Sequence, residues 1–288
     1  MELHILDVGQ RACSILKHDD DRVSLIDYGD NRQSPEFSTM PYLSNVIGLR
    51  GRLLRLILTS CYNKDVVKGF VELWRLTRFY NLWHNNLLPC ESSEESQDIS
   101  FLYDLILNRV ETDCNVVAVD AGYRTRISPL EVLSPSQSLK NNSAGRQEEA
   151  ALVIFGVTSR GNKILIAGDI GYDAWREMMF DSSTVSKISN IDVLILHGCS
   201  GGLRMPDFVS GALKPRVVVA CSSIVNSLKP TAGIVLPDVT GVIVEENDEG
   251  LQVYVWNKQF ALQHSNHLTK HYKYDAWLYC SLSLSRID

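Results

Sequence analysis

The stretch KILIAGDI, residues 163–170, decides the fold class of this chain, because one strand ends in it and a helix follows. Residues 163–167 are predicted to form a strand, because the apolar run 164–167 follows Lys163 and Gly168-Asp169 terminates it. A helix is predicted over 172–180, and a strand over 191–196, with its apolar run at 193–196, ends at His197. A strand, a helix and a further strand in this order predict an α/β protein.

The rest of the chain alternates in the same way. We expect three short strands within residues 2–27, a helix over 41–48 and a buried strand over 53–58. Two strand-rich halves of similar length predict two packed sheets flanked by helices. The other expected strands lie within 114–134, 151–157, 216–221, 240–246 and 251–256. One further helix is expected after residue 66, one after residue 99 and one from Pro206, and residues 135–149 are expected to form a loop.

The composition is that of a globular protein. The 288 residues are 45% hydrophobic and 22% charged, which excludes disordered and low-complexity classes. A formal net charge of −6 disfavours broad nucleic-acid binding, because a net-negative chain repels phosphate backbones. Every apolar run is far shorter than the ~20 residues of a membrane span. The acidic N-terminus does not fit a signal peptide, and seven irregularly spaced cysteines fit a reducing compartment, so we expect a cytoplasmic protein.

A series of short segments occurs in an order that is similar to one known family. In chain order they are LDVGQ at 6–10, LIDYG at 25–29, LTS at 58–60, KILIAGDI at 163–170, DVLILHG at 192–198 and TGVI at 240–243. With these segments the chain resembles metallo-β-lactamase-fold hydrolases, in particular the branch of the soluble domain of the bacterial DNA-uptake competence protein. The resemblance implies a four-layer αββα sandwich over residues 1–260, followed by an aromatic C-terminal extension over 261–288.

The zinc-binding signature of that family is degraded in this sequence. The family pattern S-H-x-[DH]-x-D-H-x-x-G appears as SCYNKDVVKG at 60–69, so Cys61, Asn63 and Val66 stand where ligands are expected. Lys64 adds a positive charge that opposes a dication. The opening GQGD loop has become Gly9-Gln10-Arg11-Ala12 and has lost its acid, and a lysine, Lys229, replaces a late histidine.

Four residues remain as candidates for a metal or catalytic site. They are Cys61, Asp65, Asp169 and His197, of which Asp65, Asp169 and His197 would carry the catalysis if the protein were active. The alternative for the two aspartates is structural, since a carboxylate before a helix caps free backbone N–H groups. His197 would then be a histidine satisfied within a turn.

These substitutions favour a catalytically degenerate protein, because a water-activating zinc pair cannot be assembled from them. We therefore expect no cofactor and a role as a protein-binding or regulatory subunit. Relatives in this branch occur in bacterial multi-gene systems, including antiviral ones, so the resemblance implies such a role here. The alternative is a metal-dependent hydrolase, a phosphodiesterase or nuclease, with a residual zinc site.

Two surfaces are candidates for binding partners. The aromatic residues of the C-terminal segment either dock onto the domain or contact a protein; they are Tyr272, Tyr274, Trp277 and Tyr279. A basic region interleaved with aromatic residues is the candidate for nucleic acid, through Arg50, Arg52, Arg55, Arg75 and Arg78. The alternative for this region is an amphipathic helix end with Trp74 in the core. His264, His267 and His271 would share a helical face if the segment were helical, but the polar residues around them favour an exposed, solvated segment.

Overall fold

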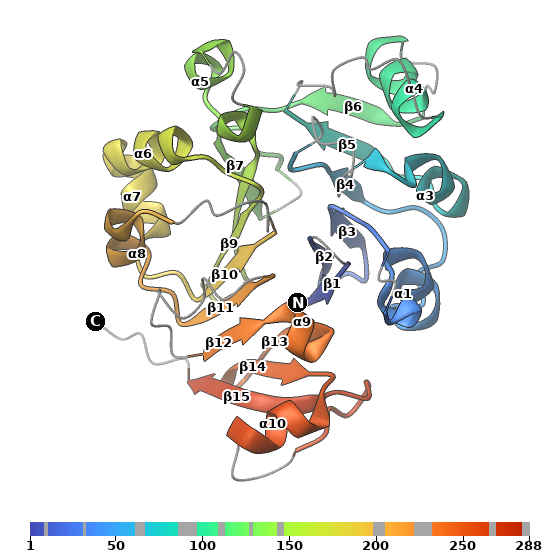
Figure 1. Cartoon of the computed structure of the whole chain (residues 1–288), viewed down its shortest axis with the longest axis vertical. Coiled ribbons are helices and arrows are strands. Elements are labelled where there is room, and N and C mark those ends of the chain that lie inside the picture. The colour runs from blue at the N-terminus through green and yellow to red at the C-terminus, as the bar shows by residue number, and fades with distance from the viewer. Residues whose placement is uncertain are drawn as a thin grey trace.

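The computed structural model consists of two β-sheets that face each other, with helices on both outer sides (Figure 1). It describes residues 1–8, 11–30, 33–60, 67–85, 97–108, 113–126, 129–142, 147–197, 205–221, 232–264 and 269–283. Among these residues, no helix is long and apolar enough to cross a membrane.

The first sheet contains nine strands among the described residues, in the order β15-β14-β13-β1-β2-β3-β4-β5-β6. Its early strands are antiparallel hairpins, whereas β3, β4, β5 and β6 run parallel. The bounds are β1 Glu2–Asp7, β2 Ala12–Lys17, β3 Val23–Ile26, β4 Arg55–Ile57, β5 Asn81–His84, β6 Asn115–Ala118, β13 Gly241–Asn247, β14 Gly250–Val255 and β15 Trp277–Ser283.

In the part of the chain that the structure describes, the second sheet has six strands, in the order β12-β11-β10-β9-β8-β7. Strands β9 to β12 are parallel and, apart from Lys163 at the start of β9, carry no charged or polar side chain, as expected for strands that are covered on both faces. The bounds are β7 Leu130–Ser134, β8 Val153–Val157, β9 Lys163–Ala167, β10 Val193–Leu196, β11 Val217–Ala220 and β12 Ala232–Val235.

Helices complete the outer layers. Figure 1 shows α1, α3 and α4 outside the first sheet and α6, α7 and α8 outside the second. This arrangement confirms the expected four-layer αββα sandwich. The bounds are α1 Thr39–Asn45, α3 Phe70–Leu76, α4 Gln97–Tyr103, α5 Gln137–Asn142, α6 Tyr172–Phe180, α7 Ser182–Ile188, α8 Asp207–Leu213, α9 Leu236–Val239 and α10 Lys258–His264, with short helical turns at Pro35–Phe37, Asp104–Asn108 and Gln147–Ala150.

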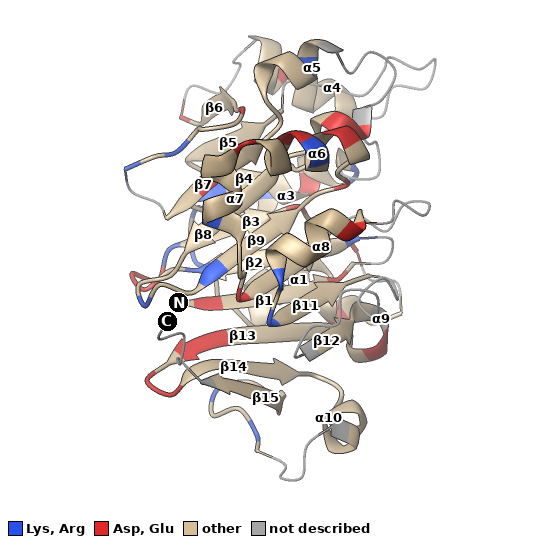
Figure 2. Cartoon of the chain, turned by 90° about the vertical axis from the view of Figure 1, so that its left-hand side faces the viewer, with Lys and Arg blue, Asp and Glu red and all other residues tan. Residues whose placement is uncertain are grey.

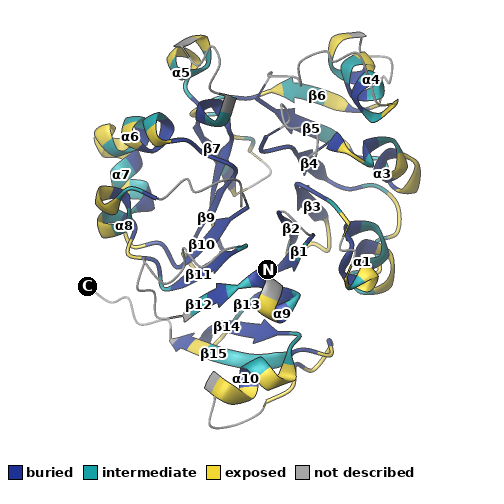
Figure 3. Ribbon diagram, viewed as in Figure 1, coloured by how far each residue is buried: buried dark blue, intermediate teal, exposed yellow. Residues whose placement is uncertain are grey.

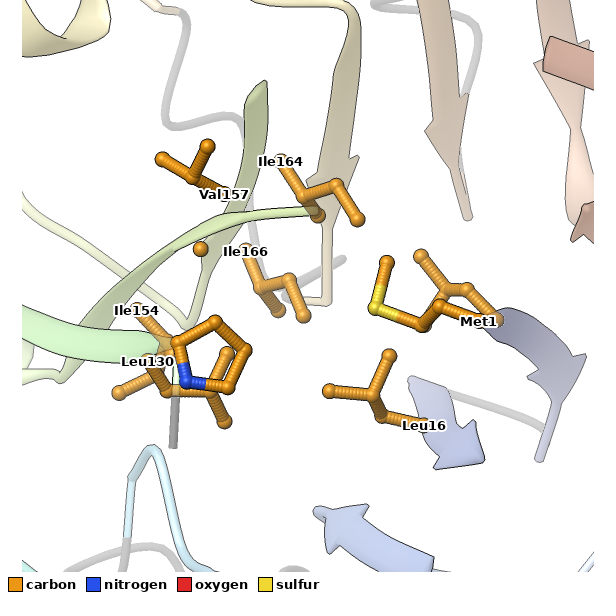
Figure 4. A pocket seen from close by; sticks show the side chains of 10 residues that line it. Met1, Leu16, Leu130, Ile154, Val157, Ile164 and Ile166 are labelled. Carbon is orange, nitrogen blue, oxygen red and sulfur yellow. The ribbon is translucent and has the colours of Figure 1, made fainter. Parts of the chain in front are cut away.

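Apolar side chains fill the space between the sheets. Ile57 and Trp83 of the first sheet and Ile166 and Val193 of the second belong to one buried cluster. Figure 3 shows most strands dark blue, with β6 and β15 at the ends of the first sheet partly teal and yellow, and the outer faces of the helices yellow, so burial follows the layers. A small cavity between the sheets, about 10 Å³, is lined by apolar side chains that include Met1 (Figure 4). An apolar void of this size offers no partners to a water molecule or a polar ligand.

Candidate functional site

The candidate site lies where parallel strands of both sheets end. Asp27 follows β3, and Thr59 follows β4 after Leu58, while Asp169 and His197 come just after β9 and β10. Strand β3 is parallel to β4, and β9 is parallel to β10. The carboxyl ends of parallel strands are the usual position of functional residues in α/β proteins, because loops from several strands converge there.

Hydrogen bonds at these strand ends tie the two sheets together. The Leu152 N–H donates to the Thr59 carbonyl at 2.7 Å, and the Ala12 N–H donates to the His197 carbonyl at 3.1 Å. The Asp169 N–H lies 3.4 Å from the Ser60 hydroxyl oxygen. The geometry of the site is therefore fixed largely by backbone contacts between the sheets.

His197 is held at both ring nitrogens. Its Nδ1 lies 2.9 Å from Asp27 Oδ2, and its Nε2 lies 2.7 Å from Ser14 Oγ. All three residues are fully buried. Because an ionised carboxylate only accepts, Nδ1 carries a proton, and Nε2 either accepts from the serine hydroxyl or donates to it. In either case, no lone pair of the imidazole points into free space.

Asp27 is the centre of this network. Its Oδ1 accepts from the Thr59 N–H at 2.8 Å and its Oδ2 from the Thr59 hydroxyl at 2.6 Å. Burial acts to raise the pKa of Asp27, but the hydrogen bond and charge of His197, the charge of Arg11 and the Thr59 hydroxyl outweigh it and hold the pKa below its usual value. The carboxylate is therefore ionised inside the protein.

Asp169 lies beside a guanidinium group. Arg11 Nη2 is 4.0 Å from Asp169 Oδ2, and both residues are buried. Asp169 and His197 are recognisable as candidates in the sequence, whereas their partners Arg11, Ser14 and Asp27 are not. The sequence feature that points to Arg11 is its position in the opening loop, since the family motif GQGD contains no basic residue there.

The described donors do not fit the zinc site of the related hydrolases. A zinc ligand must offer a lone pair, and both nitrogens of His197 are already engaged. Asp169 has a cation at 4.0 Å, which opposes a second cation there. Within the described part of the chain, no three His, Cys, Asp or Glu side chains are grouped as a metal would require. Two further candidates, Cys61 and Asp65, lie outside the described residues.

The aromatic residues of the C-terminal segment divide into buried and exposed groups. Tyr274 is 7% exposed and packs against His4, with ring centroids 5.1 Å apart. Tyr279 stacks on Phe260, and Trp277 lies under Lys258. Only Tyr272, which is 79% exposed, is available to a partner over most of its surface. Strand β15 pairs with β14, so this segment forms the edge of the first sheet.

The arginines expected to form a basic patch are not equivalent. Arg55 differs from that expectation, because it is fully buried with its guanidinium 4.1 Å from the centre of the Trp83 ring. Arg52 is paired with Asp113. Arg75 and Arg78 line a groove of about 400 Å³ between α3 and α4, which Asp104 also lines, and Arg50 is exposed. The charge available to a phosphate backbone is therefore smaller than the sequence indicates.

No family model and no curated protein matches this chain. Among solved structures it is similar to Zn²⁺-bound PqqB from Methylobacterium extorquens, with 12% identity, coverage of 68% of this chain and 72% of that chain, and a TM-score of 0.42. It is similar to MEM-A1, a subclass B3 metallo-β-lactamase from a soil metagenome, with 16% identity, 73% and 83% coverage and a TM-score of 0.38. It is also similar to a long form RNase Z from yeast, with 9% identity, coverage of 76% of this chain and 37% of that chain, and a TM-score of 0.41. These neighbours are metallo-β-lactamase-fold proteins; the αββα assignment of this chain follows from its own layers and strand order.

Proposed function

We propose that this chain is a catalytically degenerate metallo-β-lactamase-fold protein that acts as a protein-binding or regulatory subunit. The observation that carries the proposal is the state of His197. This histidine stands at a family ligand position, yet it is fully buried and both ring nitrogens are taken by Asp27 and Ser14. Metal-assisted hydrolysis needs ligands that bind the ion and an open position for water, and a locked histidine supplies neither.

Exposed aromatic side chains on the outer helices support a binding role. Tyr172 and Phe180 of α6 are 51% and 80% exposed, and Phe208 of α8 is 44% exposed. The rings of Tyr172 and Phe208 are in edge contact, with centroids 6.0 Å apart. Aromatic residues dominate the energetics of protein interfaces. We call these three residues the α6–α8 aromatic patch.

The charges around this patch indicate the kind of partner. Asp173 and Glu177 lie on α6 and Asp207 begins α8, whereas Arg176 is the one basic residue within these two helices. Figure 2 shows the acidic residues of both helices on the same side of the molecule. Acidic and aromatic side chains together favour a partner segment rich in lysine or arginine, through charge attraction and cation–π contacts.

Metal analysis and an activity assay test the degenerate state. We expect protein purified without chelator to contain far less than one zinc or manganese per chain, and to hydrolyse bis(p-nitrophenyl) phosphate no faster than buffer with either metal added. Stoichiometric metal that is lost in Asp169→Ala would contradict the proposal. It would favour the alternative, a metal-dependent phosphodiesterase or nuclease that uses Cys61, Asp65, Asp169 and His197.

Site-specific photocrosslinking tests the binding role. A photoreactive amino acid at Phe180 or Phe208 should give a discrete adduct in cells, and mass spectrometry should place the crosslink in a basic segment of another protein. Leu262 of α10 is the matched control, since it is 51% exposed but lies on another part of the molecule. Equal adducts at Phe180 and Leu262, or none at either patch position, would contradict the assignment. A place in an antiviral multi-gene system stays a prediction, which the identity of the crosslinked protein checks.

A further inference from the structure

We propose that the guanidinium of Arg11 is the internal cation of this site and takes the charge-compensating place of a metal ion. This inference rests on the proposed function in one respect, namely that the unmodified protein takes no metal there. It assigns a role to a residue that is neither part of the zinc-binding signature nor able to act as a metal ligand.

The site contains two carboxylates in a region from which water is excluded. Asp27 is 0% exposed and Asp169 is 8% exposed. An ionised carboxylate removed from water is strongly destabilising unless hydrogen bonds and an opposite charge compensate it. Thr59 and His197 supply hydrogen bonds to Asp27. In the related hydrolases, metal ions provide the positive charge of such a site.

Arg11 brings a positive charge to both carboxylates. Its Nη2 lies 4.0 Å from Asp169 Oδ2, and its charge acts on Asp27 in the direction that favours the ionised form. Only 6% of Arg11 is exposed. Its backbone is fixed on both sides, because the Val8 N–H donates to the Arg11 carbonyl at 3.0 Å and the next residue, Ala12, is bonded to His197.

One donor of the Arg11 guanidinium is left unused in the part of the chain that the structure describes. The Arg11 Nη2–Asp169 Oδ2 distance exceeds that of a hydrogen bond, and Arg11 Nη1 is buried with no hydrogen-bond partner among the described residues. A buried guanidinium with an unused donor is destabilising by itself. Its presence is explained if the Coulomb attraction to the two carboxylates, which is strong where water is excluded, offsets that cost.

This arrangement makes Arg11 and a divalent cation mutually exclusive. Both would occupy the space next to the same carboxylates, and like charges at this separation repel strongly in a buried site. Removing the guanidinium therefore has two consequences. The carboxylates lose their counter-charge, so the protein is destabilised, and the site gains affinity for an added divalent cation.

A double-mutant cycle in the full chain tests the first consequence. We expect Arg11→Met to lower the urea midpoint clearly and Arg11→Met/Asp169→Asn to lower it by less than the sum of the two single changes. The expected coupling is at least tenfold in the unfolding equilibrium constant. Arg11→Lys, which keeps the charge, should retain most of the midpoint, and the exposed Arg50→Met is the control. Additive effects, or equal losses in Arg11→Lys and Arg11→Met, would overturn the proposal. If Arg11→Met does not fold, a folded Arg11→Lys supports the proposal and an unfolded Arg11→Lys overturns it.

Added zinc or manganese tests the second consequence by thermal unfolding. We expect either ion to raise the melting temperature of Arg11→Met and to leave that of the unmodified protein unchanged. If neither ion stabilises Arg11→Met, the exchange of guanidinium for metal is overturned, while the proposed function stands. If stoichiometric metal stabilises the unmodified protein, the proposed function fails, and the double-mutant cycle still decides separately whether Arg11 compensates Asp169.

Discussion

A single carboxylate, Asp27, organises the interior of the site. It accepts two hydrogen bonds from Thr59 and one from His197, and its backbone has the left-handed φ of 54° that few non-glycine residues adopt. Replacing one oxygen by an NH₂ group places a donor against the Thr59 donors. We expect Asp27→Asn to lower the free energy of unfolding by about 2–4 kcal/mol.

Chemical denaturation measures this loss, and Asp30→Asn is the control, because Asp30 is exposed three residues further along the chain. A change at Asp27 no larger than the change at Asp30 would show that the network has no net stabilising effect. The comparison separates the buried hydrogen bonds from the simple loss of one negative charge.

The sequence predicts the members of this site unevenly. Asp169 and His197 could be identified because each ends an apolar strand within a family motif. Ser14 could not, since it lies inside a strand and its partner His197 is 183 residues away. Local sequence patterns do not show which strand positions meet across the interior. The contacts that engage both nitrogens of His197 are therefore visible only in the structure.

At the scale of elements, Gly168 allows β9 to end close to β4. A Cβ there would lie 2.7 Å from Thr59 Cβ and Oγ1 and 3.1 Å from the Leu152 carbonyl oxygen. Because Thr59 is buried and bonded to Asp27, it cannot move aside freely. We expect Gly168→Ala to be destabilising by about 1–3 kcal/mol.

At Gly211 of α8 we expect the opposite effect of a substitution by alanine, namely stabilisation. A Cβ at this helical position would meet nothing within 4 Å, so alanine adds helix propensity without a clash. Gly211→Ala should stabilise the protein by about 0.5–1 kcal/mol. Urea midpoints of the two variants check the pair, and a shift of the same sign in both would refute the packing argument for Gly168.

Tyr274 anchors the C-terminal segment to strand β1 through a hydrogen bond. Its hydroxyl donates to Glu2 Oε2 at 2.7 Å, and His271 lies 3.1 Å from Glu245 on the neighbouring strand β13. We expect Tyr274→Phe to be destabilising by about 1–2 kcal/mol, because a buried hydrogen bond to a charged group is lost. The rate at which a protease cleaves the C-terminal segment tests this expectation, with Tyr272→Phe as the control because Tyr272 is mostly exposed. Equal cleavage rates in the two variants would show that the Tyr274 hydroxyl does not hold the segment in place.

Most elements were predictable from apolar periodicity, and the failures have local causes. The helix expected over 172–180 is α6, with the same bounds. The polar segment 135–149, expected to be a loop, contains α5 over Gln137–Asn142. The segment around His271, for which an exposed conformation is favoured over a helix, differs from both, since α10 ends at His264, His271 is buried and Lys270 pairs with Trp277 in a β-bridge. Composition predicts polarity here, whereas contacts with the sheets decide the conformation.

For the whole molecule, the two-sheet architecture was predictable because fully apolar strands must be covered on both faces. The division at 260/261 stays a prediction, and the structure adds that β15 extends the first sheet beyond it. Nothing in a strand's own sequence states which edge it joins, so the order of the nine strands required the structure.

The same burial makes the stability of the whole molecule depend on pH through its histidines. Burial, together with the charge of Lys140, lowers the pKa of His84 to about 4, and burial with the charge of Arg55 lowers the pKa of His18 to about 4. In the unfolded chain these groups have pKa values near ~6.5. The folded protein therefore favours the neutral rings, and this contribution is complete above about pH 6.5 and is lost as the pH falls toward about 4.

We expect the free energy of unfolding to fall by at least about 2 kcal/mol between pH 7.5 and pH 5, to which His84, only 2% exposed, contributes together with His18 and with His4, whose pKa is also lowered by burial. Carboxylates with lowered pKa values, such as Glu2 and Asp27, contribute little in this range, because their stabilisation is lost only below their unfolded pKa values of about 4. Urea unfolding at the two pH values measures the loss. His84→Gln should be less stable at pH 7.5 but should lose less on acidification, whereas an undiminished loss in this variant would assign the pH dependence to other groups.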